Sequence, residues 1–507
     1  MIAANGNRMY VIVCLVLLPV AVLFSFARPW TATADHWETA AAIRAISENI
    51  LRPTNPIFDL PGDTSPRFTP YTVFWGVVMK FTGLGLFVVF GIAGVVNYLL
   101  FVTGLARLVR KQFQDQSLPL FALFSMLIVC GTGYHEPDSY QFADFFIMLP
   151  LVARFAYGIC FHALAALRAY LDERRPRDLG LYVMLSAISF VTHPITAAFG
   201  FVAAAAMLLA ETDLRRTILF QVVPLLALVA AIAWPYFDYF AVLIRGSVVP
   251  WFENPIKISR IFDALGPAIV GVPIILYYGL KKRLLFLAYG FVFCLLIYIL
   301  CGMARISIGS RFIWFAAFFM HLAIAQYMLE HNLLRWGNLR ASLQSQGLAF
   351  VLICALLMPA LFYRAREVKW TMGLWYDPPF HLFACESPSQ PFFFLVDRLG
   401  PSDVVMATDT TGWTIPAITG ARVIAQLKGN PLISMEVGKR RSDAAAFFGA
   451  VLSTEERQKL LREYHATHIL FDLRRAEERD PSLLRDLPVL AQKEAECGVI
   501  VLYKVPT

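Results

Sequence analysis

Charged residues are scarce in this sequence of 507 residues. Asp, Glu, Lys and Arg together make up 16% of the chain, whereas 58% of it is hydrophobic. Soluble globular proteins carry about 25% charged residues. The composition therefore excludes an ordinary soluble protein and indicates an integral membrane protein.

Two kinds of motif are also missing. The eight cysteines include no Cys-x-x-Cys pair and no Cys/His set at zinc-ligand spacing, so cysteine chemistry is not central to this protein. The net charge is +8, but no basic stretch is interleaved with stacking aromatic residues. Basic residues that hold loops on the cytoplasmic side of a membrane produce the same excess. We therefore expect no nucleic-acid partner.

Long apolar runs alternate with clusters of Arg and Lys, which mark cytoplasmic loops. The pattern predicts about eleven membrane spans within residues 1–363. With the N-terminus inside, an odd number of spans places residues 364–507 outside the cytoplasm. The first three runs lie near residues 9–27, 84–106 and 118–133, and the fourth ends before Arg168. Residues 179–210 form two short spans that turn at His193-Pro194. The last five runs lie near residues 217–243, 264–280, 284–303, 312–330 and 346–363.

The first span has a second interpretation. Arg8, the apolar run after it and the Ala32-x-Ala34 pattern also fit a cleavable signal peptide. Cleavage would leave the following loop, residues 28–83, on the same outer side of the membrane. The predicted topology of the loop does not depend on this choice.

The C-terminal segment, residues 364–507, has a different character. Short β-like runs occur at 404–407, 468–471 and 499–503, separated by amphipathic stretches. One of these begins with the capping-box pattern Ser453-x-x-Glu456. The segment is therefore predicted to form a small extracytoplasmic α/β domain. It contains Cys385 and Cys497, for which a disulfide and two free thiols both remain open.

The first outer loop carries an acidic motif, Asp35-His36-Trp37-Glu38, ahead of a helix-compatible stretch over 39–50. Asp35 and Glu38 are three residues apart and would share one face of a helix. The carboxylates could cap that helix. They could also act, together with His36, as a general base for an acceptor hydroxyl or as ligands of a divalent cation. Both interpretations stay open.

A second short outer loop contains His135, Glu136 and Asp138. Because Pro137 favours a turn, this loop could be an ordinary solvated connection. If the first and third spans pack together, it would face the first loop and add a second acidic or metal-ligating group. We therefore keep these three residues as candidates for the same site.

Three arginines are candidates for binding the phosphate of a lipid-borne substrate. Arg305 and Arg311 flank a late outer connection, where positive charge is otherwise rare. Their alternative role is anchoring at the interface by snorkelling. Arg154 is predicted deep in the fourth span, where a charge needs an ion-pair partner, a cavity or an anion.

Taken together, these features resemble the GT-C superfamily of polytopic membrane glycosyltransferases, which includes protein O-mannosyltransferases, the lipid A aminoarabinose transferase and oligosaccharyltransferases. The resemblance covers nearly the whole chain. It is carried by Asp35-His36, His135-Glu136, the hairpin at His193-Pro194, Ser310-Arg311-Phe312 and the C-terminal α/β segment.

The resemblance implies a glycosyltransferase that works on the outer face of the membrane. It would use a polyprenyl-phosphate sugar donor and a glycan, lipid or protein acceptor. Asp35 would be the catalytic carboxylate, and Arg311 or Arg305 would bind the donor phosphate. Because His36 stands where an Asp or Glu is commoner in the family, metal dependence stays open, with Asp35 and Glu136 as the candidate ligands.

Two other classes of function remain as alternatives. A transporter or lipid flippase would be expected to have paired repeats and several charges within the membrane, whereas the sequence has no internal repeat and only Arg154 deep in a span. A non-catalytic membrane scaffold would use its C-terminal domain to bind a partner.

Overall fold

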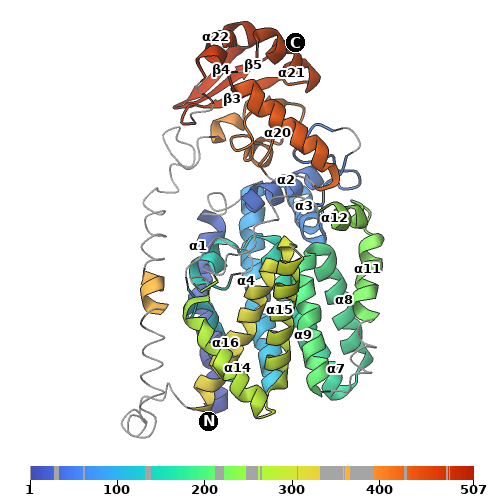
Figure 1. Cartoon of the computed structure of the whole chain (residues 1–507), viewed down its shortest axis with the longest axis vertical. Coiled ribbons are helices and arrows are strands. Elements are labelled where there is room, and N and C mark those ends of the chain that lie inside the picture. The colour runs from blue at the N-terminus through green and yellow to red at the C-terminus, as the bar shows by residue number, and fades with distance from the viewer. Residues whose placement is uncertain are drawn as a thin grey trace. The chain divides into compact units, whose positions relative to one another are not determined.

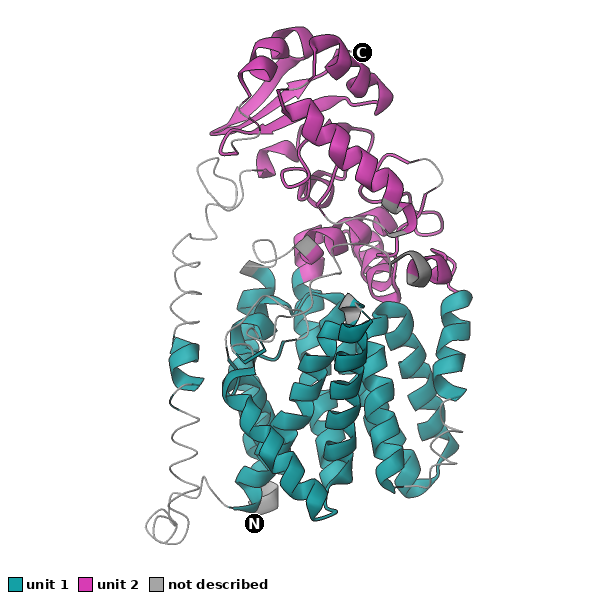
Figure 2. Cartoon of the chain, viewed as in Figure 1, with its two compact units in different colours: residues 1–28, 91–233, 250–373 teal, residues 29–90, 234–249, 374–507 magenta. Residues whose placement is uncertain are grey.

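The computed structural model of the chain is mostly helical (Figure 1). It describes residues 2–27, 34–60, 63–131, 139–211, 222–246, 261–262, 265–304, 306–331, 358, 360–365, 392–427, 431–450, 452–475, 478 and 480–506. The chain divides into two compact units (Figure 2). The first unit is Met1–Arg28, Gly91–Ala233 and Pro250–Gly373, and the second unit is Pro29–Phe90, Trp234–Val249 and Leu374–Thr507.

The first unit is a bundle of apolar helices. Within the described residues, five helical stretches are long and apolar enough to cross a membrane: Gly6–Phe26, Leu86–Phe113, Pro194–Glu211, Leu285–Met303 and Gly309–Glu330. Shorter apolar helices cover Leu118–Ile128, Val222–Ile232 and Gly266–Leu280. These helices coincide with predicted spans and confirm an integral membrane protein. Most of the predicted last span, 346–363, lies outside the described residues.

The bundle is built from the following described helices. They are α1 (Ile2–Ala27), α4 (Leu86–Phe113), α5 (Leu118–Ile128), α6 (Phe142–Ile147), α7 (Val152–Glu173), α8 (Pro176–Thr192), α9 (Pro194–Glu211), α11 (Val222–Ile232), α14 (Gly271–Leu280), α15 (Leu285–Met303) and α16 (Phe312–Glu330). The predicted break at His193-Pro194 separates α8 from α9. The His193 Nδ1 lies 2.8 Å from Thr196 Oγ1 there, so the ring closes the turn.

Aromatic packing holds α7, α9 and α16 together. The ring of Phe199 stacks on Phe315 with centroids 5.0 Å apart, and Phe161 stacks on Phe318 at 5.3 Å. His321 of α16 is fully buried, with Nδ1 3.0 Å from Ser125 Oγ of α5. A buried polar group in a membrane bundle needs such a partner.

The second unit contains a five-stranded sheet with the order β2-β1-β3-β5-β4. The strands are β1 (Val404–Met406), β2 (Arg422–Val423), β3 (His468–Asp472), β4 (Gln492–Cys497) and β5 (Ile500–Lys504). β1 pairs in parallel with β2 and β3, whereas β5 pairs antiparallel with β3 and β4. The three predicted β-like runs became β1, β3 and β5. The polar strand β4 and the two-residue strand β2 carry no apolar run and were not predicted.

Successive side chains of β1 and β3 point to opposite faces of the sheet, and both faces are buried at these two strands. Met406 and Phe471 pack on one face with α20 (Ser434–Phe448), α21 (Thr454–Glu463) and α22 (Pro481–Leu490). Val405 and Leu470 pack on the other face together with Phe58, from the loop at residues 28–83. The Ile57 carbonyl accepts a hydrogen bond of 2.7 Å from the Val423 amide. The segment that contains Ile57 and Phe58 therefore shares a core with the C-terminal segment.

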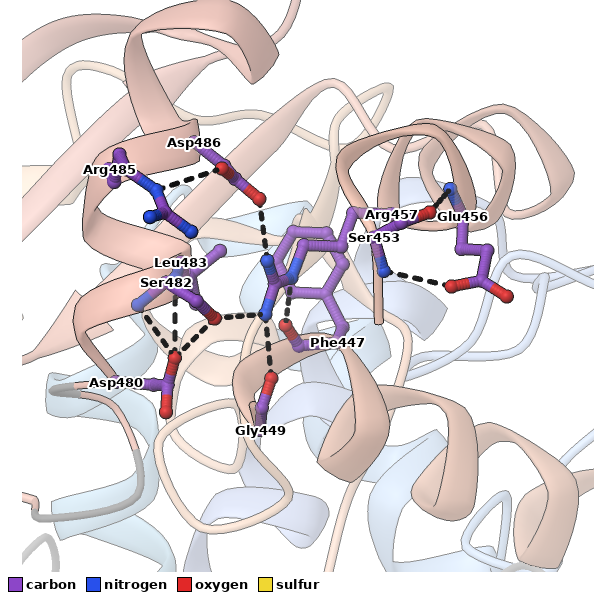
Figure 3. A network of polar contacts seen from close by, with 10 residues as sticks. All are labelled: Phe447, Gly449, Ser453, Glu456, Arg457, Asp480, Ser482, Leu483, Arg485 and Asp486. Atoms are coloured by element: carbon purple, nitrogen blue, oxygen red, sulfur yellow. Dashed lines mark hydrogen bonds and ion pairs between the residues drawn. The ribbon is translucent and has the colours of Figure 1, made fainter. Parts of the chain in front are cut away.

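A buried arginine ties the helices on one face of the sheet to each other (Figure 3). Arg457 of α21 has no exposed surface, and its guanidinium donates to the carbonyls of Phe447 and Gly449, at the end of α20. It also bonds Asp486 of α22 at 2.7 Å. Just before it, Ser453 and Glu456 form the predicted capping box at the start of α21. The guanidinium of Arg457 thus provides donors to carbonyls that the end of α20 leaves without partners inside the helix.

Cys497, at the end of β4, is disulfide-bonded, which excludes a free thiol at this position. Cys385 lies outside the described residues.

Candidate functional site

The acidic motif Asp35-His36-Trp37-Glu38 lies at the start of helix α2 (Ala34–Glu48) in the second unit. The helix begins before Thr39, where the helix-compatible stretch was expected to start, so Asp35 lies in its first turn. Negative charge is favourable at that end of a helix. α2 packs so closely on α3 (Pro70–Thr82) that a Cβ on Gly76 would lie only 2.4 Å from Ile46 Cγ2. This packing fixes the direction of α2.

Arg67 brings the two carboxylates of the motif together. Its Nη2 lies 3.0 Å from Asp35 Oδ1 and also pairs with Glu38 Oε2. Burial lowers the pKa of the guanidinium, but Glu38 and Asp35 raise it more, so the net shift is upward. The site is therefore a carboxylate pair that shares one fixed cation.

The two carboxylates differ in exposure. The side chain of Asp35 is 20% exposed, whereas that of Glu38 is 5% exposed. Glu38 is also bound from the C-terminal segment, because Gln426 Nε2 donates to its Oε1 over 2.6 Å. Each oxygen of Glu38 thus has its own donor, and Asp35 is the more accessible acid of the pair.

Further contacts join α2 to the C-terminal segment. Arg44 of α2 donates to the Ala417 carbonyl over 3.1 Å and to the Ile418 carbonyl over 2.9 Å. These carbonyls lie in the short helix α19 (Ile415–Thr419), near its C-terminal end, where a cation is favourable. Arg422 donates to Thr54 Oγ1 over 2.7 Å. Helix α2, which carries the carboxylate pair, and the loop after it are therefore joined to the C-terminal segment at several points.

His36, the third candidate in the motif, is fully buried. Its ring meets the Phe90 ring edge-on, with centroids 6.0 Å apart. Trp37 beside it is 8% exposed. Of the four residues in the motif, Asp35 is the one with appreciable exposed surface.

The described arginine candidates belong to the first unit. Arg154 is fully buried near the start of α7, where Nη2 donates to the Ser139 carbonyl and the guanidinium lies 5.1 Å from the Phe145 ring centroid. Arg311 is partly buried at the end of the short helix η3 (Ser307–Arg311), directly before α16. His135, Glu136, Asp138 and Arg305 lie outside the described residues. Their roles stay predictions.

The first unit contains one more buried cation, which the sequence did not single out. Arg364 is 6% exposed, and its Nη2 donates to the carbonyls of Cys130 and Gly131. Those carbonyls follow α5 and directly precede the second acidic loop. Arg364 follows the predicted last span, where an arginine looks like one more basic residue at a span end.

Within the described part of the chain, no group of three or more His, Cys, Asp or Glu residues is arranged to hold a metal ion. Asp35 and Glu38 face a guanidinium instead, which would compete with a divalent cation for the same oxygens. Glu136, the other candidate ligand, lies outside the described residues. Metal ligation by Asp35 and Glu136 therefore stays a prediction.

Arg67 and Gln426 are not among the site residues that the sequence predicts. Arg67 follows Asp35 by 32 residues and Gln426 follows Glu38 by 388, and no periodicity links positions so far apart. A weak signal for Arg67 was its place in the same outer loop as the acidic motif.

No family model matches this sequence, and no curated protein does. The structure, however, is similar to ArnT from Cupriavidus metallidurans in the apo state, with a TM-score of 0.56 over 99% of this chain and 98% of that chain at 13% identity. ArnT bound to undecaprenyl phosphate gives a TM-score of 0.55 at the same coverage and identity. The apo oligosaccharyltransferase of Archaeoglobus fulgidus gives 0.53 at 13% identity, over 96% of this chain and 73% of that one.

These likenesses define the class of fold. The chain is an integral membrane protein with a GT-C-like fold, composed of a helical membrane domain and a C-terminal α/β segment. The resemblance drawn from the sequence motifs is confirmed at the level of the fold.

Proposed function

We propose that this protein is a membrane glycosyltransferase that moves a sugar from a polyprenyl-phosphate donor to an envelope glycan, lipid or protein on the outer face of the membrane. The observation that carries the proposal is the Asp35–Arg67–Glu38 arrangement in the first outer loop. The fold supports it, because the similar structures are an oligosaccharyltransferase and an ArnT that was solved with undecaprenyl phosphate.

In this proposal Asp35 is the catalytic carboxylate. It accepts the proton of an acceptor hydroxyl while the hydroxyl oxygen bonds to the anomeric carbon of the donor. The bond from that carbon to the phosphate oxygen breaks, and the polyprenyl phosphate leaves with the electron pair. A single displacement of this kind inverts the configuration at the anomeric carbon.

Arg67 and Glu38 position Asp35. Because Arg67 bonds Asp35 Oδ1 at 3.0 Å, the carboxylate has a fixed direction before substrate arrives. Glu38 holds Arg67, and Gln426 holds Glu38. Preorganisation matters because a displacement of about 1 Å can cost on the order of a hundredfold in rate.

The leaving phosphate needs positive charge near it. Arg311, Arg305 and Arg154 are the cations that we propose for this role. A divalent metal ion at Asp35 and Glu136 would supply the same stabilisation of charge.

We also propose that the second unit is extracytoplasmic. The disulfide of Cys497 supports this location, because disulfides persist mainly in oxidising compartments. The positive-inside pattern of the loops supports the same side.

The proposal is tested by replacing the catalytic acid. Envelope glycans, lipids and proteins are analysed by mass spectrometry in cells that lack the gene and carry the wild type, Asp35→Asn or Asp59→Asn. Asp59 is an exposed acid of the same loop and is the matched control. We expect Asp35→Asn to insert normally and to lose the sugar modification, and Asp59→Asn to retain it. An Asp35→Asn protein with wild-type activity would reject the assignment.

A further inference from the structure

The C-terminal part of the second unit contains a cavity of about 380 Å³ that is separate from the carboxylate pair. It is lined by Thr408, Asp409, Gly438, Arg441, Ser442, Ala445 and Phe448. Ligand pockets in proteins are typically about 300–1,000 Å³. The cavity is therefore large enough to hold a small polar molecule such as one sugar ring.

The cavity lies at the carboxyl end of β1, one of two neighbouring parallel strands whose connections diverge. Thr408 and Asp409 follow the carboxyl end of β1, which pairs in parallel with β2 on one side and β3 on the other. After β1 the chain proceeds to β2, and after β3 it proceeds to β4 at the opposite edge. Connections that diverge from two neighbouring strands leave a crevice at their carboxyl ends.

The loop after β1, which contributes Thr408 and Asp409 to the cavity, is held by several hydrogen bonds. The hydroxyls of Thr408 and Thr411 donate to Oε1 of the buried Glu478 over 2.5 Å and 2.7 Å. The Gly412 amide donates to the Thr408 carbonyl over 2.8 Å, and a Cβ on Gly412 would lie 2.9 Å from the Ala425 carbonyl oxygen. The loop after β1 is thus fixed in shape before any ligand binds.

One face of α20 forms the opposite wall. Gly438, Arg441, Ser442 and Ala445 are spaced at i, i+3, i+4 and i+7, so they lie on one side of the helix. Glycine is a poor helix former, and nothing lies within 4 Å of a Cβ built on Gly438. Packing therefore does not require a glycine there. Its effect is to keep the wall of the cavity bare.

The polar groups of the cavity suit a neutral polyhydroxylated ligand. Arg441 Nε lies 3.1 Å and Nη2 lies 3.0 Å from Asp409 Oδ2, so the two charges compensate each other. The pair offers N–H donors and carboxylate acceptors side by side, as vicinal hydroxyls require. A phosphate would need uncompensated positive charge.

We propose that this cavity binds a neutral saccharide of the acceptor, which makes the acceptor a glycan. The role as an acceptor site rests on the proposed glycosyltransferase function, whereas saccharide binding does not. Asp409 and Arg441 bind the sugar hydroxyls, and the bare face at Gly438 accommodates the ring.

The test is a binding measurement on the full-length protein in nanodiscs. The probes are neutral oligosaccharides released by mild acid from the envelope of the producing organism and, in a separate titration, inorganic phosphate. The variants are Gly438→Leu, which fills the cavity, and Asp409→Asn. The matched control is Gly400→Leu, because Gly400 also has nothing within 4 Å of a built Cβ and does not line the cavity.

We expect the oligosaccharides to bind the wild type and Gly400→Leu equally, and both cavity variants to bind at least tenfold more weakly. Wild-type binding by Gly438→Leu, absence of oligosaccharide binding, or binding of phosphate in place of oligosaccharide would each overturn the saccharide site.

A second measurement separates this inference from the proposed function. In Asp35→Asn, oligosaccharide affinity should equal that of the wild type while transfer is lost. In Gly438→Leu, transfer should show a raised KM for the acceptor and an unchanged kcat. A changed kcat with unchanged KM would overturn the acceptor role.

Discussion

Gln426 Nε2 donates a hydrogen bond of 2.6 Å to Oε1 of Glu38, although the two residues are 388 positions apart. Both side chains are buried, at 2% and 5% exposure. A buried carboxylate is stable when its oxygens have donors, and here Arg67 and Gln426 provide one donor to each oxygen. The acidic motif of the first loop is thus completed by the C-terminal segment.

Arg67→Gln should remove the cation that orients Asp35. We expect sugar transfer to fall by on the order of a hundredfold, because the carboxylate loses its fixed direction. Arg67→Lys should retain only part of the activity, because the ammonium keeps the positive charge but cannot reproduce the planar guanidinium. Initial rates of transfer in membranes check this order.

The matched control for Arg67 is Arg52→Gln, an exposed arginine of the same loop, which should transfer sugar at the wild-type rate. Equal rates for Arg67→Gln and Arg52→Gln would show that Arg67 does not position the acid.

Arg457→Met should destabilise the C-terminal α/β segment. The substitution leaves Asp486 and the carbonyls of Phe447 and Gly449 without their buried donor. Removing one partner of a buried ion pair lowers the free energy of unfolding by about 3–5 kcal/mol. Thermal unfolding of the purified protein should therefore begin at a clearly lower temperature.

Arg485→Met is the control for Arg457, because Arg485 approaches the same Asp486 but only at 3.9 Å and with 80% of its side chain exposed (Figure 3). Loss of an exposed contact of this kind changes the free energy of unfolding by no more than about 0.5 kcal/mol. Equal unfolding temperatures for the two variants would contradict the structural role of Arg457.

Glu478 should make the stability of the second unit depend on pH. Burial raises the pKa of its carboxyl above the ordinary value of 4.5, although the Thr408 hydroxyl, the Asp472 amide and the Thr411 hydroxyl oppose the shift. A carboxyl with a raised pKa in the folded state stabilises the fold at pH below its unfolded pKa, and this contribution is lost as the pH rises through the folded value.

The comparison for Glu478 is Glu478→Gln, which cannot titrate. The melting temperature of the wild type relative to that of this variant should fall as the pH rises from 4 to 7. A difference that is constant or grows over that range would show that the folded pKa is not raised.

The sequence by itself determined the membrane class, the places of the apolar helices and three of the strands. These features depend on composition and on short periodic patterns, which act through contacts between residues close in the chain. The break at His193-Pro194 and the capping box of Ser453 and Glu456 are local in the same sense. The GT-C resemblance could be drawn because its motifs follow these same spans and loops.

Only the tertiary structure decided which groups surround Asp35 and Glu38. Arg67 and Gln426 reach the motif because the first loop contributes Phe58 to the core of the C-terminal segment, and burial of apolar side chains has no fixed spacing in sequence. The same holds for the cavity beside Asp409 and Arg441. The cavity exists because one face of α20 packs beside the carboxyl end of β1, and these two elements are not neighbours in the sequence.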